Sequence, residues 1–317
     1  MLPLKVIWNP LEGIDLGFFT IHFYSLTYVI AFALGWYIIK PMLNRDGLTG
    51  DKLDPLFTYT VVGCLLGARL GHFLFYETEV FFNDPLHVLL PFELDPFEWT
   101  GFAGMASHGA ALGIIIAMIF YSRKHLKFNP MWILDRLVIP TAIGGTFIRL
   151  GNLMNSEING KETDAATGFK FVRDLSDDNV RAALQKTGLT DTDKAIDALV
   201  SNPKFQPLLD TIAYKHPAQL YEAICYVGVF IVLYLTYWKT EKRHKVGYLL
   251  GMFFVFLFTI RFFIEFLKEP QTKHDAYVIL GMDLNTGQLL SIPFVLLGLF
   301  LMFRPEGMFK KEWNTGK

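Results

Sequence analysis

Three arginines, Arg69, Arg149 and Arg261, stand inside long apolar stretches of this sequence. On insertion scales, an arginine near the centre of a membrane-spanning helix costs roughly 2.5–3.5 kcal/mol, and less towards the helix ends. Packing alone does not explain three such residues on three different stretches. The guanidinium group stays protonated, and its planar fork matches the oxygens of a phosphate group. The chemistry indicated is recognition of an anion at the level of a membrane.

Further polar side chains occur in the same apolar stretches. They are His22, Tyr24, His72, His108, Asn152, Gln219, Tyr221, Glu222, Glu265 and Gln288. If successive stretches cross the bilayer in alternate directions, these residues and the three arginines all lie in the same half of the membrane. An anionic molecule with an apolar body at that depth is a phospholipid. The sequence therefore predicts a site that binds or acts on an anionic lipid.

Simpler roles remain open for several of these residues. Arg261 and Glu265 are four residues apart and could form a structural pair on one helix face. Arg69 could extend towards lipid headgroups. Asp135 and Arg136, at the other end of the fourth stretch, are expected to form an interfacial ion pair.

The composition indicates a polytopic membrane protein. Of 317 residues, 52% are hydrophobic and 19% are charged, against about 25% charged in soluble proteins. A net charge of −1 gives no reason to expect nucleic acid as a partner. The two cysteines, Cys64 and Cys225, lie in apolar stretches, which argues against a disulfide framework or a cysteine metal site. The sequence has no zinc-hydrolase, nucleophile-elbow or phosphate-loop motif, so neither a metal nor a cofactor is expected.

Seven stretches approach the roughly 20 residues of helix that a bilayer core requires. They cover residues 19–39, 55–76, 101–121, 130–151, 217–238, 246–266 and 287–303. The predicted fold class is an all-α polytopic membrane protein with seven transmembrane helices and a small extracytoplasmic head.

Orientation follows from the charges of the short connections. The connections after the first, third and fifth stretches are rich in lysine and arginine, whereas residues 77–100 carry six acidic residues and no basic ones. Because basic connections stay in the cytoplasm, the N-terminus is expected outside the cell and the C-terminus inside. The predicted organisation is 1–154 for helices one to four, 155–216 for the head, 217–303 for helices five to seven, and 304–317 for a cytoplasmic tail.

The head contains its own helix signals. Ser176-Asp177-Asp178 opens a stretch that ends at Gly188, and Thr190 can cap a second helix from Thr192.

Seven sequence blocks, in order along the chain, resemble those of the prolipoprotein diacylglyceryl transferase family. They read HFYSLTYVIAF (22–32), GARLGHFLFY (67–76), SHGAALG (107–113), GGTFIRLGNLMNSEING (144–160), HPAQLYEA (216–223), RFFIEFLKEP (261–270) and GQLLSIP (287–293). At three places the residues differ from those of the family pattern. Ala110 replaces a glycine, Asn155-Ser156-Glu157 replaces Asn-Gly-Glu, and Lys268-Glu269-Pro270-Gln271 replaces Arg-x-Pro-Asp. The head is also longer than is usual in the family.

The resemblance implies an enzyme of the bacterial inner membrane that needs no cofactor. Its reaction moves the diacylglyceryl group of phosphatidylglycerol onto the lipobox cysteine of a preprolipoprotein. A thioether forms and glycerol phosphate leaves, as the first step of lipoprotein maturation. The catalytic residues implied are Tyr24, His108, Arg149, Arg261 and Glu265. The residues implied to bind phosphatidylglycerol are Arg69, Arg149, Asn152, Glu157, Gly160 and Arg261.

A mechanism can be written on these residues. A free cysteine has a pKa near 8.5, so a base near the thiol helps, and His108 is the first candidate, with lipid positioning as its alternative role. Arg149 and Arg261 would stabilise the leaving phosphate, and Glu265 would orient Arg261. Two other classes of protein stay open at this point. They are a lipid transporter, and a sensor in which the helices only anchor the head.

Overall fold

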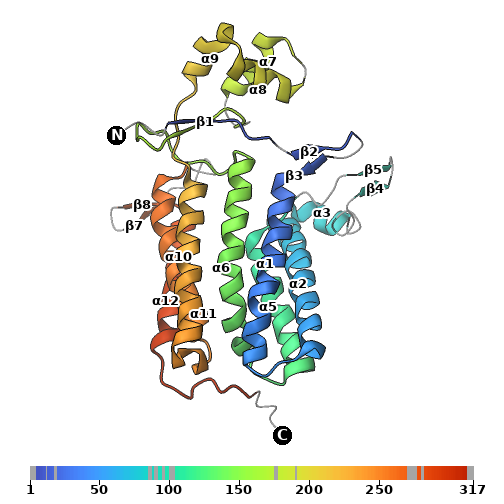
Figure 1. Ribbon diagram of the computed structural model, residues 1–317, viewed down its shortest axis with the longest axis vertical. Helices are drawn as coiled ribbons and strands as arrows, with labels where there is room; N and C mark the ends of the chain where they lie inside the picture. The colour runs from blue at the N-terminus through green and yellow to red at the C-terminus, as the bar shows by residue number, and fades with distance from the viewer. Residues whose placement is uncertain are drawn as a thin grey trace.

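The computed structural model describes residues 5–11, 13–17, 20–84, 88, 92–94, 97–99, 104–174, 178–189, 191–269, 277–279 and 282–312. Most of them are helical (Figure 1). Six helices in this part of the chain are long and apolar enough to cross a membrane. They are α1 (Phe23–Arg45), α2 (Gly50–Tyr76), α6 (Pro130–Met154), α10 (Ala218–Lys239), α11 (Tyr248–Ile264) with its continuation to Leu267, and α12 (Thr286–Phe303).

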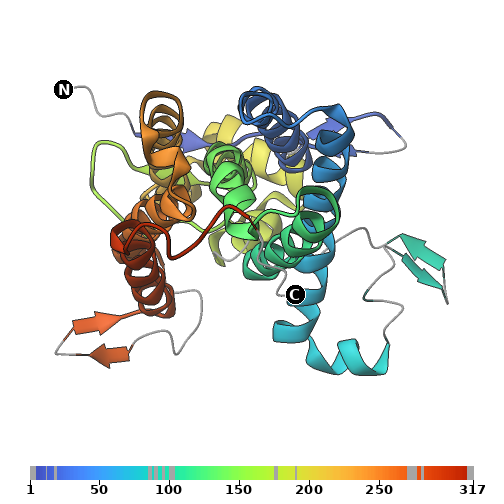
Figure 2. The same cartoon turned by 90° about the horizontal axis from the view of Figure 1, so that it is seen from below.

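Helix α6 is the most buried of the six and lies at the centre of the bundle. Viewed along the helices, it stands between α1, α2 and α5 on one side and α10, α11 and α12 on the other (Figure 2). Each side has its own apolar core. Ile133 of α6 packs in one with Leu43 and Tyr121, and Ile139 of α6 packs in the other with Leu249. Side chains on the two sides of α6 are therefore placed by different sets of neighbours.

Helix α5 (Ser107–Tyr121) corresponds to the third predicted span. Its 15 residues extend about 22 Å, which is less than a bilayer core of about 30 Å, and a π-helical turn η1 (Ser122–Leu126) follows. Residues 101–103 of the predicted span lie outside the described residues. Ala110, which stands where the family has glycine, donates its N–H to the carbonyl of Ala106 at 3.0 Å, as any helical residue can.

Glycines let α5 approach α2 to backbone contact. Gly63, Gly67 and Gly71 recur every fourth residue on α2 and face Gly109 and Gly113 of α5. A Cβ atom on Gly113 would lie 2.7 Å from Gly67 Cα, and one on Gly71 would lie 2.6 Å from Gly109 Cα. Small residues at helix contacts are the usual means of close packing between helices in membranes.

We expect Gly113→Val to lower the free energy of unfolding by about 3 kcal/mol, because backbone atoms in the way cannot rotate aside. Thermal and denaturant unfolding of the purified protein measure the change. Gly228→Val on α10 is the matched control, since nothing lies within 4 Å of a Cβ added there. Equal destabilisation by both variants would contradict the close α2–α5 contact.

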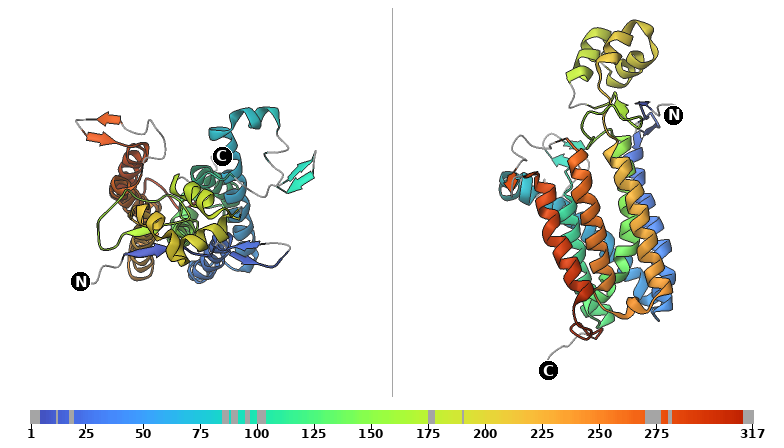
Figure 3. Two further views of the ribbon diagram at one scale, coloured as in Figure 1. Left: turned by 90° about the horizontal axis from the view of Figure 1, so that it is seen from above. Right: turned by 90° about the vertical axis from the view of Figure 1, so that its left-hand side faces the viewer.

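A small layer of structure covers one end of the bundle (Figure 3). Strand β1 (Val6–Trp8) pairs in parallel with β6 (Phe169–Phe171). Beyond them lie α7 (Asp178–Thr187), α8 (Thr192–Ser201), the 3-10 turn η2 (Pro203–Phe205) and α9 (Gln206–Thr211). Val172, Ile196 and Leu209 form part of a separate apolar core in this region, which we call the head. The indole N–H of Trp8 donates to the carbonyl of Leu153 at 2.8 Å and ties the strand pair to the end of α6.

The head helices begin and end close to the predicted residues. Helix α7 ends at Thr187, before Gly188, which has a φ of 68°. Helix α8 begins at Thr192, but its N-cap is Asp191, whose carboxylate accepts the N–H of Lys194 at 3.1 Å. The predicted cap, Thr190, lies outside the described residues.

Short strands correct the start of the first predicted span. Residues Thr20–His22 form strand β3, which pairs antiparallel with β2 (Gly13–Asp15), and α1 begins only at Phe23. Two further hairpins, β4 (Phe92–Leu94) with β5 (Phe97–Trp99) and β7 (Tyr277–Ile279) with β8 (Met282–Leu284), and the short helix α3 (Thr78–Asn83) lie in connections at the head end (Figure 1).

At the opposite end, the expected ion pair between Asp135 and Arg136 is wrong. The buried carboxylate of Asp135 accepts the N–H groups of Gly247 at 2.6 Å and Leu250 at 2.8 Å, so it caps the start of α11. Arg136 instead pairs with Asp46 at 2.9 Å. Adjacent residues on a helix point in different directions, which is why these two have different partners.

Candidate active site

The polar residues predicted to share one depth lie at the head end of the bundle. Helices α6 and α11 end there, and α1, α5, α10 and α12 begin there (Figure 1). Arg149 and Asn152 belong to the last turns of α6, Glu222 to the first turns of α10, and Arg261 to the last turn of α11.

Arg149 contacts Glu222 on α10 and Asn152 on its own helix. Its Nε lies 2.7 Å from Oε2 of Glu222, and its Nη1 donates to Oδ1 of Asn152 at 3.2 Å. Glu222 is 0% exposed, whereas the Arg149 side chain is 18% exposed. A carboxylate buried on α10 therefore fixes a guanidinium group that keeps some accessible surface.

Glu157 joins this group through the way α6 ends. The N–H of Glu157 donates to the carbonyl of Asn152 at 3.1 Å, and that of Ser156 donates to Leu153 at 3.0 Å, which is a Schellman motif. This turn brings the Glu157 carboxylate back to the Asn152 side chain, whose Nδ2 donates to it at 2.7 Å. Arg149, Asn152 and Glu157 thus form one hydrogen-bonded row.

Ser156 occupies the position of this motif that usually carries glycine. Its φ is 54°, in the left-handed region that is costly for a residue with a Cβ atom. Its Oγ is buried and has no hydrogen-bond partner within the described part of the chain. The departure from the family's Asn-Gly-Glu therefore keeps the geometry of the turn at the expense of stability.

We expect Ser156→Gly to raise the free energy of unfolding by about 1 kcal/mol, because it removes the Cβ atom and the unpaired hydroxyl group together. Ser156→Ala removes only the hydroxyl group and should raise the free energy of unfolding by a smaller amount. The unfolding midpoints of the two variants measure this difference. An equal increase in stability for both variants would mean that the positive φ of Ser156 does not destabilise the protein.

Lys268 connects the two arginine regions. Its Nζ donates to Oε1 of Glu222 and to Oε1 of Glu265, both at 3.0 Å, and its side chain is 3% exposed. Glu265, in the 3-10 turn η4 (Glu265–Leu267), lies 3.7 Å from Nε of Arg261. Arg149, Glu222, Lys268, Glu265 and Arg261 thus form a continuous series of ion pairs, which we call the ion-pair chain.

Two members of the ion-pair chain, Glu222 and Lys268, are not among the catalytic and lipid-binding residues that the family resemblance implies. Glu222 shares the predicted depth of the others, and Lys268 keeps a positive charge where the family pattern has arginine. Those two signals could have found them. The predicted pair of Arg261 with Glu265 is present. The Glu265 carboxylate also accepts hydrogen bonds from Nζ of Lys268 and, at 3.2 Å, from Nδ2 of Asn285.

The loop after α6 is held against α10 and η4. Gln219, 0% exposed, donates its Nε2 to the carbonyl of Glu157 at 2.5 Å and to Oδ1 of Asn159 at 2.7 Å. Gly160 fits between His216 and Leu267, and an added Cβ would lie 2.6 Å from the His216 carbonyl oxygen. The structure therefore gives Gly160 a packing contact beside Lys268.

Lys215 ties this loop to the head. Its Nζ lies 3.1 Å from Asp174 and 3.2 Å from Glu269. Burial alone would lower the pKa of Lys215, but the two carboxylates raise it above its usual value. The lysine therefore stays charged and holds the loop, the head and the end of η4 together.

Tyr24 lies beside this group. A Cβ on Gly151 would lie 2.9 Å from the Tyr24 ring, which places the ring on α6 next to Asn152. The Tyr24 hydroxyl lies 2.9 Å from that of Tyr28.

Arg69 and His108 are on the α2–α5 side of the bundle. Arg69 is 6% exposed, donates its Nε to the carbonyl of Val88 at 2.9 Å, and lies 4.6 Å from the ring centre of Phe73. The described contacts of His108 are with the rings of Phe75 and Tyr76, and its side chain is exposed.

Comparison with known proteins places this chain in a family. The family model for prolipoprotein diacylglyceryl transferase matches residues 12–304. The phosphatidylglycerol–prolipoprotein diacylglyceryl transferase of Tolumonas auensis is 35% identical over 299 residues, which cover 94% of this chain and 96% of that protein. Proteins of the same name from Bacteroides fragilis and Porphyromonas gingivalis are 37% and 35% identical, and each match covers at least 95% of both chains. This chain belongs to the prolipoprotein diacylglyceryl transferase family.

Proposed function

We propose that this protein transfers the diacylglyceryl group of phosphatidylglycerol to the lipobox cysteine of preprolipoproteins. Family membership and the names of its relatives support the reaction. The observation that carries it is the ion-pair chain, which joins arginines from two different helices at one end of the bundle. A transporter binds its substrate near the middle of the bilayer, whereas the ion-pair chain lies at one end of the bundle. A sensor that uses its helices only as an anchor would leave the arginines within them unexplained.

The reaction is a displacement at a glycerol carbon. The cysteine thiolate attacks the carbon that carries the phosphate ester, a carbon–sulfur bond forms, and the carbon–oxygen bond breaks. The electron pair of that bond goes to the phosphate oxygen, and glycerol phosphate leaves with the added charge. No covalent intermediate on the protein is required.

Arg149 and Arg261 suit the leaving phosphate in different ways. Arg149 is fixed by Glu222 and Asn152, so little reorganisation is needed when charge develops. The Arg261 side chain is 37% exposed, and its ion pair with Glu265 is long, at 3.7 Å, so its donors remain available to an anion. Asn152 and Glu157 offer an amide and a carboxylate to the glycerol hydroxyls of the headgroup. Tyr24, whose ring lies on α6 next to Asn152, remains a proposed catalytic residue. Gly160, beside Lys268, and Arg69, on the α2–α5 side, remain proposed contacts of phosphatidylglycerol.

His108 is the proposed base for the thiol, because a neutral imidazole accepts a proton near pH 7. We expect His108→Gln to lower the transfer rate far more at pH 7 than at pH 9, where the thiol ionises without help. Rates measured at both pH values with a lipobox peptide test this role. An equal loss at both would assign His108 to positioning instead.

The proposed arrangement in the membrane has α5 as a seventh span and residues 155–216 outside the cytoplasm. Its support is the close α2–α5 contact and the charges of the connections. We therefore propose a bacterial inner-membrane location, with the C-terminal tail in the cytoplasm. A cysteine introduced at Lys186 should react with a membrane-impermeant reagent in intact cells. A cysteine that does not react would mean that residues 155–216 lie in the cytoplasm.

Reconstitution tests the proposed function directly. The purified protein in phosphatidylglycerol vesicles should add one diacylglyceryl group to a lipobox peptide, seen by mass spectrometry as a thioether product. Phosphatidylcholine vesicles and a peptide with serine in place of the lipobox cysteine are the controls. Lipid movement without peptide modification would instead identify a transporter.

A further inference from the structure

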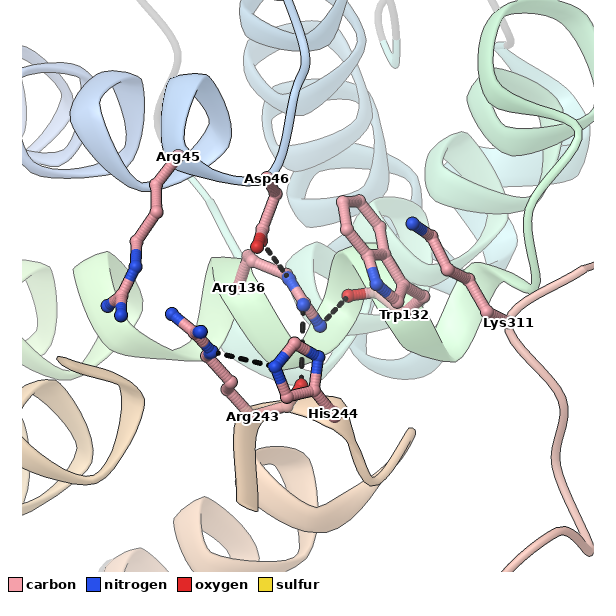
Figure 4. Close-up of a pocket in the computed structure, with 7 residues that line it drawn as sticks. All are labelled: Arg45, Asp46, Trp132, Arg136, Arg243, His244 and Lys311. Carbon is pink, nitrogen blue, oxygen red and sulfur yellow. Dashed lines mark hydrogen bonds and ion pairs between the residues drawn. The ribbon is translucent and has the colours of Figure 1, made fainter. Parts of the chain in front are cut away.

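A cavity lies at the end of the bundle opposite the head. It has a volume of about 240 Å³, and four separate segments of the chain line it (Figure 4). The end of α1 supplies Arg45 and Asp46, and α6 supplies Trp132 and Arg136. The 3-10 turn η3 (Glu241–His244) supplies Arg243 and His244, and the C-terminal segment supplies Lys311.

Arg136 forms a fixed wall of this cavity. Its side chain is buried, its Nε lies 2.9 Å from Asp46, and its guanidinium group lies 3.9 Å from the ring centre of Trp132. Its Nη1 and Nη2 donate to the carbonyls of Trp132 at 3.1 Å and Arg243 at 3.3 Å. These contacts hold a permanent positive charge in one position.

Two more cations lie at the rim against aromatic rings. The Arg45 guanidinium lies 4.6 Å from the ring centre of Trp238, and the Lys311 ammonium lies 4.4 Å from that of Phe128. The N–H of Asn129 donates to the carbonyl of Lys311 at 2.7 Å, which fixes the C-terminal segment beside the cavity. A ring contact positions a cation and leaves its N–H groups free to meet an anion.

Arg243 supplies an unmatched donor. Its Nη1 is buried and has no hydrogen-bond partner in the described part of the protein, while its Nε contacts Nε2 of His244 at 3.1 Å. The Arg45 and Arg243 guanidinium groups point into the same space (Figure 4). A buried donor without a partner costs free energy that a bound acceptor would recover.

The charges lining the cavity do not balance. Arg45, Arg136, Arg243 and Lys311 contribute four positive charges, and Asp46 is the one carboxylate among the described lining residues, so these five side chains have a net charge of +3. Asp46 is already occupied, because it accepts from Arg136 and from the Tyr237 hydroxyl at 3.1 Å. The carboxylate of Glu241 lies 3.2 Å from Nε2 of His244, but Glu241 does not line the cavity.

We infer that this cavity binds the phosphate group of an anionic ligand. Several guanidinium groups around one space match phosphate oxygens, and basic cavities between membrane helices suit anionic headgroups. The phosphate comes either from a lipid in the leaflet at this end or from a soluble phosphate. The cavity is at the other end of the bundle from the ion-pair chain, so this inference does not depend on the proposed reaction.

The test compares two double variants of the full-length protein in neutral detergent. Arg243→Gln with Lys311→Gln removes two cations of the cavity. Arg123→Gln with Lys310→Gln removes one arginine and one lysine that are exposed at the same end and do not line it. Calorimetric titrations use inorganic phosphate, dihexanoyl phosphatidate and, as a zwitterionic comparison, dihexanoyl phosphatidylcholine. Anion binding at the head end is common to all variants and cancels in the comparison.

We expect the cavity variant to bind phosphatidate at least tenfold more weakly than the wild type, and the control variant to stay within twofold. The same loss with inorganic phosphate indicates a soluble ligand, and a loss with phosphatidate alone indicates a lipid. Should the cavity variant fail to fold, Lys311→Gln alone, at an exposed rim position, should still weaken binding about threefold. Equal binding by the wild type and the cavity variants, or equal losses in the control, would overturn the inference.

Discussion

Arg149→Lys is expected to lower kcat/KM for diacylglyceryl transfer by about 10²–10³-fold, the usual effect of removing one preorganised donor that stabilises developing charge. Lysine keeps the positive charge near Glu222 but has no planar fork. It therefore cannot hold Glu222 and Asn152 through Nε and Nη1 and still present a donor to phosphate. Transfer of labelled diacylglyceryl groups to a lipobox peptide provides the measurement.

The control for this prediction is Arg123→Lys, an exposed arginine at the far end of the bundle, which should retain wild-type turnover. The unfolding midpoint of the Arg149 variant should remain near that of the wild type. Turnover within a few-fold of the wild type would show that charge alone suffices at this position, and the proposed phosphate contact would be wrong.

Lys268→Met is expected to reduce the free energy of unfolding by about 3–5 kcal/mol, the usual consequence of removing one partner from a buried ion pair. The variant leaves two carboxylates, Glu222 and Glu265, without the ammonium group that separates them. Glu222 is completely buried, so its charge has no access to water. Denaturant unfolding in a fixed lipid–detergent mixture measures the effect.

A double-mutant cycle tests whether this cost comes from the pair. Glu222→Gln with Lys268→Met removes one charge of each sign, so it should destabilise the protein by less than the sum of the two single variants. Lys194→Met, at an exposed lysine that pairs with Asp191, should have no measurable effect. Strict additivity of the Glu222 and Lys268 variants would mean that they do not interact across the helix contact.

The sequence predicts at which end of the bundle a residue lies better than it predicts which neighbours its side chain contacts. Hydropathy and the alternation of the helices place Arg149, Glu222 and Arg261 at one end, and the structure agrees. They do not say which way round a helix each side chain points. The ion-pair chain joins Arg149 to Arg261 through three side chains between them, whereas His108 and Arg69 lie with α2 and α5. Packing between helices decides that, and packing depends on pairs distant in the sequence.

Glycine and proline residues predicted the ends of helices correctly where a segment's structure depends on its own sequence. Gly188 ends α7, and Pro203 follows α8, as the head sequence indicates. Such local signals failed where the partner comes from elsewhere. Asp135 caps α11 from α6, more than 110 residues earlier in the chain, so its carboxylate could be read only as a neighbour of Arg136.

The ion-pair chain also has a consequence for biogenesis. Arg149 is synthesised 73 residues before Glu222, because the head lies between them in the sequence. Helix α6 is thus made with a cation near its end, and the carboxylate that pairs with this cation is made only with α10. We therefore expect a chain truncated within the head to insert less stably than the full-length protein, and its amount in the membrane fraction measures this.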